Sequence, residues 1–138
     1  MIYVDANYWI YWFDRRFPEH KYVMKTMRAA IHEGIVLNLV TLMEVAHYLR
    51  HLPREDFRQK TLTMQSLATL KFVNLDLDLA ELAFEQLMEY TGIGVGGRDS
   101  VILATMKATA TRRIATHDEV FKKIENLEVV DSIPQSER

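Results

Sequence analysis

The segment MIYVDANYWIYWF, residues 1–13, decides the fold because it joins an apolar strand to an acid and then to an aromatic helix. Residues 1–5 have the composition of a short buried strand, and residues 6–13 are predicted to form a short helix. Solubility is a poor explanation for an acid at the end of an apolar strand. Asp5 is therefore the first candidate functional residue.

The alternation of short apolar strands and longer helices continues along the chain. Strands are expected at 1–5, 35–40, 71–75, 112–116 and 128–130, and helices at 6–13, 20–33, 41–52, 54–70, 77–90 and 99–110, with a short helix ending at 121 and a loose tail from 134. Strands separated by helices favour parallel pairing through right-handed crossovers. We predict one α/β domain over residues 1–138, with three α/β/α layers around a central parallel sheet of four to five strands.

Composition narrows the function classes. The chain has no cysteine, which excludes disulfides, thiolate metal sites and a cysteine nucleophile. No secretory signal and no apolar segment of about 20 residues is visible, so a cytoplasmic location away from the membrane is expected. The net charge is −2, from 17 basic and 19 acidic residues. If a metal site holds four of the acids, 15 remain against 17 basic residues, so net charge does not exclude a nucleic-acid partner.

Three further acids stand at positions comparable to that of Asp5. Glu44 follows the second strand, Asp99 follows a glycine-rich loop, and Asp118 follows the fourth strand. Ligands of open α/β sheets bind beyond the carboxyl ends of the strands. Carboxylates that converge there raise one another's pKa unless a cation lies between them. The set of four therefore predicts a divalent metal and hydrolytic phosphate chemistry.

Each acid also has a structural interpretation as a helix cap. Asp99 and Asp118 precede helical segments, and Asp is a favoured N-cap residue. Thr41-Leu42-Met43-Glu44 has the pattern of a capping box. Asp76 and Asp78 are expected to cap the helix over 77–90, and Asp14 is expected at the surface. For the four acids taken together, we favour metal binding over capping alone.

A glycine-rich loop offers a rival function. Glycines 92, 94 and 97 form a G-x-G-x-x-G pattern, which is typical of dinucleotide-binding loops. That fingerprint requires a strand directly before the loop, whereas residues 77–90 have helical periodicity. The histidines offer a weaker alternative, since His47 and His51 have a zinc-compatible spacing but lack a third ligand. We interpret this histidine pair as part of a solvated helix face.

Four motifs in order make the chain resemble the PIN-domain ribonucleases, most closely the small VapC-type toxins of prokaryotic toxin–antitoxin pairs. The motifs are Val4-Asp5-Ala6-Asn7, Thr41-Leu42-Met43-Glu44, Arg98-Asp99-Ser100-Val101-Ile102-Leu103-Ala104-Thr105 and Thr116-His117-Asp118-Glu119-Val120-Phe121. The chain departs from the family at Ala6, where Thr or Ser is frequent, and in its glycine-rich stretch before Asp99. The resemblance covers nearly the whole chain and implies a PIN-like fold.

The resemblance implies Mg²⁺ or Mn²⁺ and cleavage of single-stranded RNA. On that basis the four acids are the catalytic set, with Asp5, Asp99 and Asp118 as metal ligands and no organic cofactor. We expect Asn7 and Thr116 to orient these ligands. Residues expected to contact the RNA are Arg98, Arg15 and Arg16. The family also implies a cognate antitoxin and a homodimer.

The aromatic segment 8–13 is too apolar to be exposed all round, so part of it is expected in the core and part against a protein partner. Two other functions stay open at this stage. One is a PIN-like RNA-binding or processing factor without catalysis. The other is a nucleotide-binding module that uses the loop at 92–97.

Overall fold

A computed structural model, described here for residues 1–135, contains one five-stranded sheet in which all strands are parallel. Its order is β3-β2-β1-β4-β5. The strands are β1 (Ile2–Val4), β2 (Ile35–Asn38), β3 (Leu70–Val73), β4 (Arg113–Ala115) and β5 (Glu128–Val130). Five parallel strands confirm the predicted sheet. Residues 136–138 of the expected tail lie outside the described residues.

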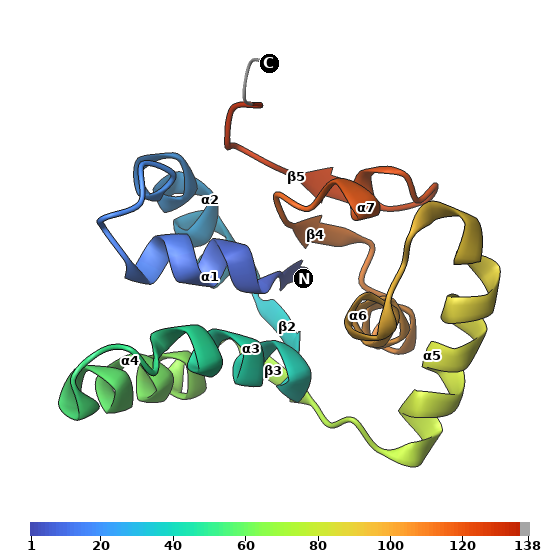
Figure 1. Cartoon of the computed structure of the whole chain (residues 1–138), viewed down its shortest axis with the longest axis horizontal. Helices are drawn as coiled ribbons and strands as arrows, with labels where there is room; N and C mark the ends of the chain where they lie inside the picture. Colours follow the sequence, from blue (N-terminus) through green and yellow to red (C-terminus); the bar gives the residue numbers. More distant parts are fainter. Residues whose placement is uncertain (136–138) are drawn as a thin grey trace.

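Helices cover both faces of this sheet and complete the predicted three layers. The helices are α1 (Ala6–Phe13), α2 (His20–Glu33), α3 (Leu39–Leu49), α4 (Arg54–Ser66), α5 (Leu77–Glu89), α6 (Gly97–Ala108) and α7 (Glu119–Lys122), with a 3-10 turn η1 (Thr91–Ile93). Figure 1 shows α1 to α4 on one side of the sheet and α5 and α6 on the other. The chain therefore reverses its winding direction between β3 and β4. Within residues 1–135, no helix combines the length and apolarity needed to cross a membrane.

The aromatic side chains of α1 are partly in the core and partly at the surface, as the composition of the segment indicated. Tyr8 and Trp9 are fully buried, and the Trp9 indole donates a hydrogen bond of 3.1 Å to the backbone oxygen of Val4. Trp12 and Phe13 are partly buried and pack against the core and Trp9. This packing fixes α1 against the end of β1, directly after Asp5.

The start of α3 differs from the prediction. The strand β2 ends at Asn38, whose side chain accepts a 2.9 Å hydrogen bond from the Val40 amide and caps a helix that begins at Leu39. Thr41 is therefore inside the helix, and the capping box predicted at 41–44 is wrong. The apolar residues run from strand into helix without interruption, so periodicity alone placed the boundary too late. Asn38 is among the best N-cap residues and marks the boundary that was missed.

A buried hydroxyl connects β1 to the start of α3. The hydroxyl groups of Tyr3 and Thr41 lie 2.6 Å apart, and the Asn38 amide donates to the Tyr3 oxygen at 3.1 Å. The Asn38 side chain in turn donates to the Thr105 hydroxyl on α6 at 3.1 Å. All four side chains are fully buried, and burial raises the pKa of Tyr3 above its ordinary value. This network holds β1, α3 and α6 in register beside one another.

We predict that Tyr3→Phe lowers the free energy of unfolding by about 1–3 kcal/mol, because it leaves a buried amide and a buried hydroxyl without a partner. Urea denaturation measures the difference. The control is Tyr22→Phe, which removes a hydroxyl from a side chain that is 38% exposed. Equal stabilities of the two variants would contradict a structural role for the Tyr3 hydroxyl.

Candidate active site

The four acids predicted from the sequence meet at one place in the structure. Asp5 directly follows β1, and Asp118 lies just beyond the neighbouring strand β4. Because the chain winds in opposite directions on either side of this strand pair, their carboxyl ends border the crevice where open α/β sheets bind ligands. Glu44 reaches the crevice from α3 and Asp99 from the first turn of α6.

A single guanidinium group, that of Arg98, lies among the four carboxylates. Its Nη1 donates to Asp5 at 2.9 Å and to Glu44 at 3.0 Å. Its Nη2 donates to Asp99 at 2.7 Å and to Asp118 at 3.3 Å. The Arg98 side chain is 31% exposed, so this cationic centre is open to solvent on one side. The four acids therefore surround one cationic group.

Asp5 is the most constrained of the four acids. It is fully buried, and its Oδ1 accepts from the Ala6 amide at 2.8 Å in addition to Arg98. Its Oδ2 accepts from the Thr116 hydroxyl at 2.7 Å. Asn7 donates to Thr116 at 3.4 Å and accepts from the His117 amide at 3.3 Å. Thr116 and Asn7 thus hold Asp5 and the loop after β4 together, in the place predicted for orienting residues.

Helix capping and cluster formation turn out to be compatible. One oxygen of Asp118 accepts from the Val120 amide at 3.1 Å and caps α7, while the other faces Arg98. Asp99 is not the N-cap of its helix as predicted, because α6 begins at Gly97. It is the third residue of the helix, and one of its oxygens accepts from the Gly96 amide at 3.3 Å. Each cap fixes one carboxylate oxygen and leaves the other for the site.

Burial and charge act in opposite directions on the titration of the cluster. Burial raises the pKa values of Glu44 and Asp99, the positive charge of Arg98 lowers them, and the neighbouring acids raise them again. Burial lowers the pKa of Arg98, but attraction by Asp5, Glu44 and Asp99 raises it above its ordinary value. Arg98 therefore stays charged and partly compensates the mutual repulsion of the acids.

The chemistry of the four side chains fits a hard divalent cation, and the Arg98 guanidinium lies among them. Carboxylate oxygens are the ligands that Mg²⁺ and Mn²⁺ prefer. The four carboxylate oxygens that face Arg98 accept from two separate nitrogens of a planar guanidinium, so they do not surround a single point. In residues 1–135, no three His, Cys, Asp or Glu side chains come close enough to one another to hold a metal ion. A metal and the Arg98 guanidinium would thus compete for the same oxygens.

The other predicted RNA contacts lie away from the acids. Arg16 donates to Asp14 at 2.8 Å and contacts His51 at 2.9 Å, beyond the far end of α1. Asp14 was expected at the surface, but it is only 9% exposed and also accepts from the Tyr48 hydroxyl at 3.0 Å. The position of Asp14 just after an aromatic helix did not indicate that its side chain is buried and bonded to Arg16 and Tyr48. Arg15 is exposed beside it.

Two further basic groups near α7 are engaged elsewhere. His117 and Lys122 both contact Asp131 at 2.8 Å, and Lys122 also donates to Glu119 at 3.0 Å. Arg98 is therefore the cation that the described structure places against all four acids. The sequence placed Arg98 beside the site, but nothing in the sequence pattern indicated a bond to every acid at once.

The glycine loop lacks the strand that a dinucleotide fingerprint needs. Helix α5 and the turn η1 precede it, and Gly94 adopts a φ of +86°. A left-handed φ favours glycine, which explains that residue without a bound phosphate. The loop delivers the chain into α6, where Arg98 and Asp99 occupy the second and third positions.

Comparison with known proteins identifies a family and a shared fold. The sequence matches the PIN domain over residues 2–127. No curated protein matches the sequence.

Solved structures with low sequence identity share this fold. VapC20 of Mycobacterium tuberculosis, a sarcin–ricin loop cleaving toxin, has a TM-score of 0.74 at 18% identity, covering 88% of this chain and 93% of its own. VapBC2 of Rickettsia felis bound to promoter DNA has a TM-score of 0.70 at 18% identity, and the match covers 95% of this chain and 98% of the other. A toxin–antitoxin complex of Klebsiella pneumoniae has a TM-score of 0.64 at 22% identity, and the match covers 94% of this chain and 96% of the other.

We predict that Arg98→Met lowers the free energy of unfolding by about 1–3 kcal/mol at pH 7.5 in chelator, less than for a fully buried pair because Arg98 is partly exposed. Urea denaturation measures the loss, and exposed Arg28→Met is the control.

The loss should shrink at lower pH. Without Arg98, the folded carboxylates take higher pKa values than in the unfolded chain, so the folded state binds more protons and stability falls as the pH rises through that interval. A deficit that is the same at pH 4.5 and pH 7.5 would show that Arg98 stabilises the fold by packing rather than by charge.

Proposed function

The chain belongs to the PIN domain family, and from this premise we propose that it is a metal-dependent endoribonuclease that cleaves single-stranded RNA as the toxin of a toxin–antitoxin pair. The observation that carries the proposal is the convergence of Asp5, Glu44, Asp99 and Asp118 on one cationic group. These residues come from four distant segments. Helix capping therefore does not explain why an oxygen of each one contacts the same guanidinium group.

In the proposed mechanism the carboxylates have separate roles. Asp5, Asp99 and Asp118 would hold Mg²⁺ or Mn²⁺, and Glu44, whose side chain is 38% exposed, would complete the shell through water. Held by these carboxylates, an ion would lower the pKa of a bound water, which is the nucleophile that hydrolysis of a phosphodiester needs. Thr116 donates to Asp5 and keeps that carboxylate oriented, while Asn7 fixes the loop that carries Asp118. These contacts reduce the reorganisation needed when substrate binds.

Arg98 has two proposed partners. In the metal-free protein it neutralises the acids, and its guanidinium would have to leave them for an ion to bind. The side chain is partly exposed, and a freed guanidinium beside the site can pair with a phosphate through two parallel hydrogen bonds. This keeps Arg98 as the substrate contact predicted from the sequence.

We also propose a cognate antitoxin and a homodimer as partners. The structures of similar fold include complexes of a toxin with its antitoxin. Exposed apolar side chains lie on α5 at helical spacing, with Leu77 74%, Phe84 53% and Met88 79% exposed. Such a group of exposed apolar residues on one helix supports a protein interface.

One observation favours a second candidate, an RNA-binding or processing factor without catalysis. Arg98 already provides a charged hydrogen-bond partner for each carboxylate. If no divalent ion displaces it, the acids have no catalytic metal, and RNA bound elsewhere on the protein would not be cleaved. The two functions differ in chelator, where the binding factor keeps its full activity and the nuclease loses turnover.

We predict that Asp5→Asn abolishes Mg²⁺- or Mn²⁺-dependent cleavage of a labelled single-stranded RNA, at least a hundredfold in rate, because the variant loses a central anionic ligand. Gel analysis of the products measures it. The control Asp76→Asn should keep full activity, since Asp76 caps α5 and Asn caps equally well. Retained activity in Asp5→Asn would remove Asp5 from the mechanism.

Competition between Arg98 and metal gives a second prediction. Arg98→Met should bind Mn²⁺ about tenfold or more tightly than the unsubstituted protein, a gain of about 1.4 kcal/mol, because no guanidinium has to be displaced. Electron paramagnetic resonance of free Mn²⁺ measures the affinity without reference to activity. Arg28→Met should bind as the unsubstituted protein does, and Asp5→Asn should bind more weakly. Unchanged affinity in Arg98→Met would exclude competition for the same oxygens.

A further inference from the structure

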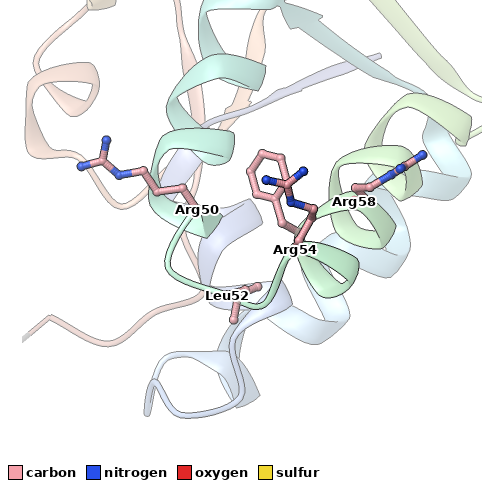
Figure 2. A pocket seen from close by; sticks show the side chains of 5 residues that line it. Arg50, Leu52, Arg54 and Arg58 are labelled. Atoms are coloured by element: carbon pink, nitrogen blue, oxygen red, sulfur yellow. The ribbon is translucent and has the colours of Figure 1, made fainter.

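A second charged site lies at the corner between α3 and α4, away from the four acids. An open cavity of about 410 Å³ is lined there by Arg50, Leu52, Arg54, Phe57 and Arg58. Figure 2 shows the three arginines on the two helix ends, with Arg54 between Arg50 and Arg58. No acid is among the lining residues. We propose that this cavity binds the phosphate backbone of the RNA strand whose cleavage is proposed above.

The three guanidinium groups have no other partner. Within residues 1–135, none of them forms an ion pair or a side-chain hydrogen bond, whereas Arg16, Arg98 and Arg113 are each paired with acids. Three like charges around one cavity repel one another, and bound phosphates would relieve that repulsion. The site therefore gains from an anionic ligand that the chain itself does not supply.

Nearby acids do not cancel this charge inside the cavity. Glu55 and Asp56 occupy the first turn of α4 together with Arg54. Glu55 lines a neighbouring cavity that it shares with Arg58, and neither Glu55 nor Asp56 lines the cavity with the three arginines. Arg54 and Arg58 are four residues apart on α4, and Figure 2 shows their guanidinium groups extending in different directions, so each would contact a different phosphate of a bound strand.

The floor of the cavity suits nucleotides. Leu52 and Phe57 are partly buried and pack against the hydrophobic core, so each is held in place and offers only part of its surface. Proteins that bind single strands combine cationic grooves with aromatic surfaces on which bases stack. An arginine cluster above an apolar floor matches that combination.

The position along α3 favours RNA over an acidic peptide. Met43, His47 and Arg50 are exposed and lie at helical spacing on one face of α3, next to Glu44 of the acid site. Arg50 lies six positions after Glu44, which corresponds to about 9 Å along a helix. No acid occurs between them in the sequence. A strand held at the acids can therefore continue over α3 to the arginines without crossing negative charge.

The test compares two triple variants with the same change in charge. Arg50, Arg54 and Arg58 are replaced by Gln in one. In the other, three exposed basic residues on other parts of the surface, Arg28, Lys107 and Arg112, are replaced by Gln. Fluorescence anisotropy measures binding of a labelled 2′-O-methyl oligouridine in chelator at several salt concentrations. This probe cannot be cleaved through its 2′-hydroxyl, and thermal melting verifies that both variants fold.

We expect the cavity variant to bind at least tenfold more weakly than the control variant at low salt. Its plot of log affinity against log salt should also be shallower by about 2, because each lost phosphate contact on a single strand removes about 0.7 from the slope. Equal affinity and slope in the two variants would overturn the proposal. Displacement of the oligonucleotide by polyglutamate as readily as by unlabelled oligonucleotide would overturn the assignment to RNA.

RNA binding and RNA cleavage are measured separately, so failure of this site can be distinguished from failure of the proposed nuclease function. If the unsubstituted protein shows no metal-dependent cleavage but the cavity variant still loses RNA binding, the proposed nuclease function fails and the RNA site stands. If cleavage occurs but both triple variants bind alike, the nuclease stands and this site fails.

Discussion

The structure depends on the contact between one guanidinium and four carboxylates. Asp5 is fully buried, and Asp99 is nearly so, at positions where ionised groups destabilise a fold unless they are paired. Arg98 provides the pairing from the same helix turn as Asp99, at distances of 2.7–3.3 Å to all four acids. One positive charge against four acids leaves an excess of negative charge. That excess is the physical basis of the proposed metal binding.

The fold brings the acids together through ordinary local rules. Asp5 and Asp118 follow adjacent parallel strands, so their proximity comes from the strand order. Asp118 and Asp99 each give one oxygen to a backbone amide at the start of a helix, which fixes the direction of the second oxygen. Each cap thus leaves one carboxylate oxygen facing the site and holds the side chain in a fixed orientation. The buried contact between Tyr3 and Thr41 keeps α3, and with it Glu44, against β1.

Sequence patterns could predict a parallel α/β sheet and the set of acids at its edge, but neither the strand order nor the contacts among the acids. Alternating apolar and amphipathic segments suffice for a parallel sheet, and acids after strands suffice for a site at its edge. The boundary of α3 was misplaced because Leu39 and Val40 are apolar in either element, and only the capping by Asn38 separates them. The burial of Asp14 and the fourfold pairing of Arg98 depend on tertiary proximity to Tyr48 and Glu44, for which sequence spacing holds no signal.

Opposite charges are separated along α3, and this separation explains why a net charge of −2 says little about partners. Glu44 faces the acid site, while Arg50 at the C-terminal end of the same helix is favoured by the helix dipole. An RNA strand approaching the acids alone would be repelled. In the proposed complex, Arg50 about 9 Å further along α3 and the arginines at the start of α4 would offset that repulsion locally and raise the concentration of the strand near the site. The proposed strand binding and the proposed metal binding would then use different ends of one helix, so the arginines that hold the strand would not compete with the metal for the carboxylates.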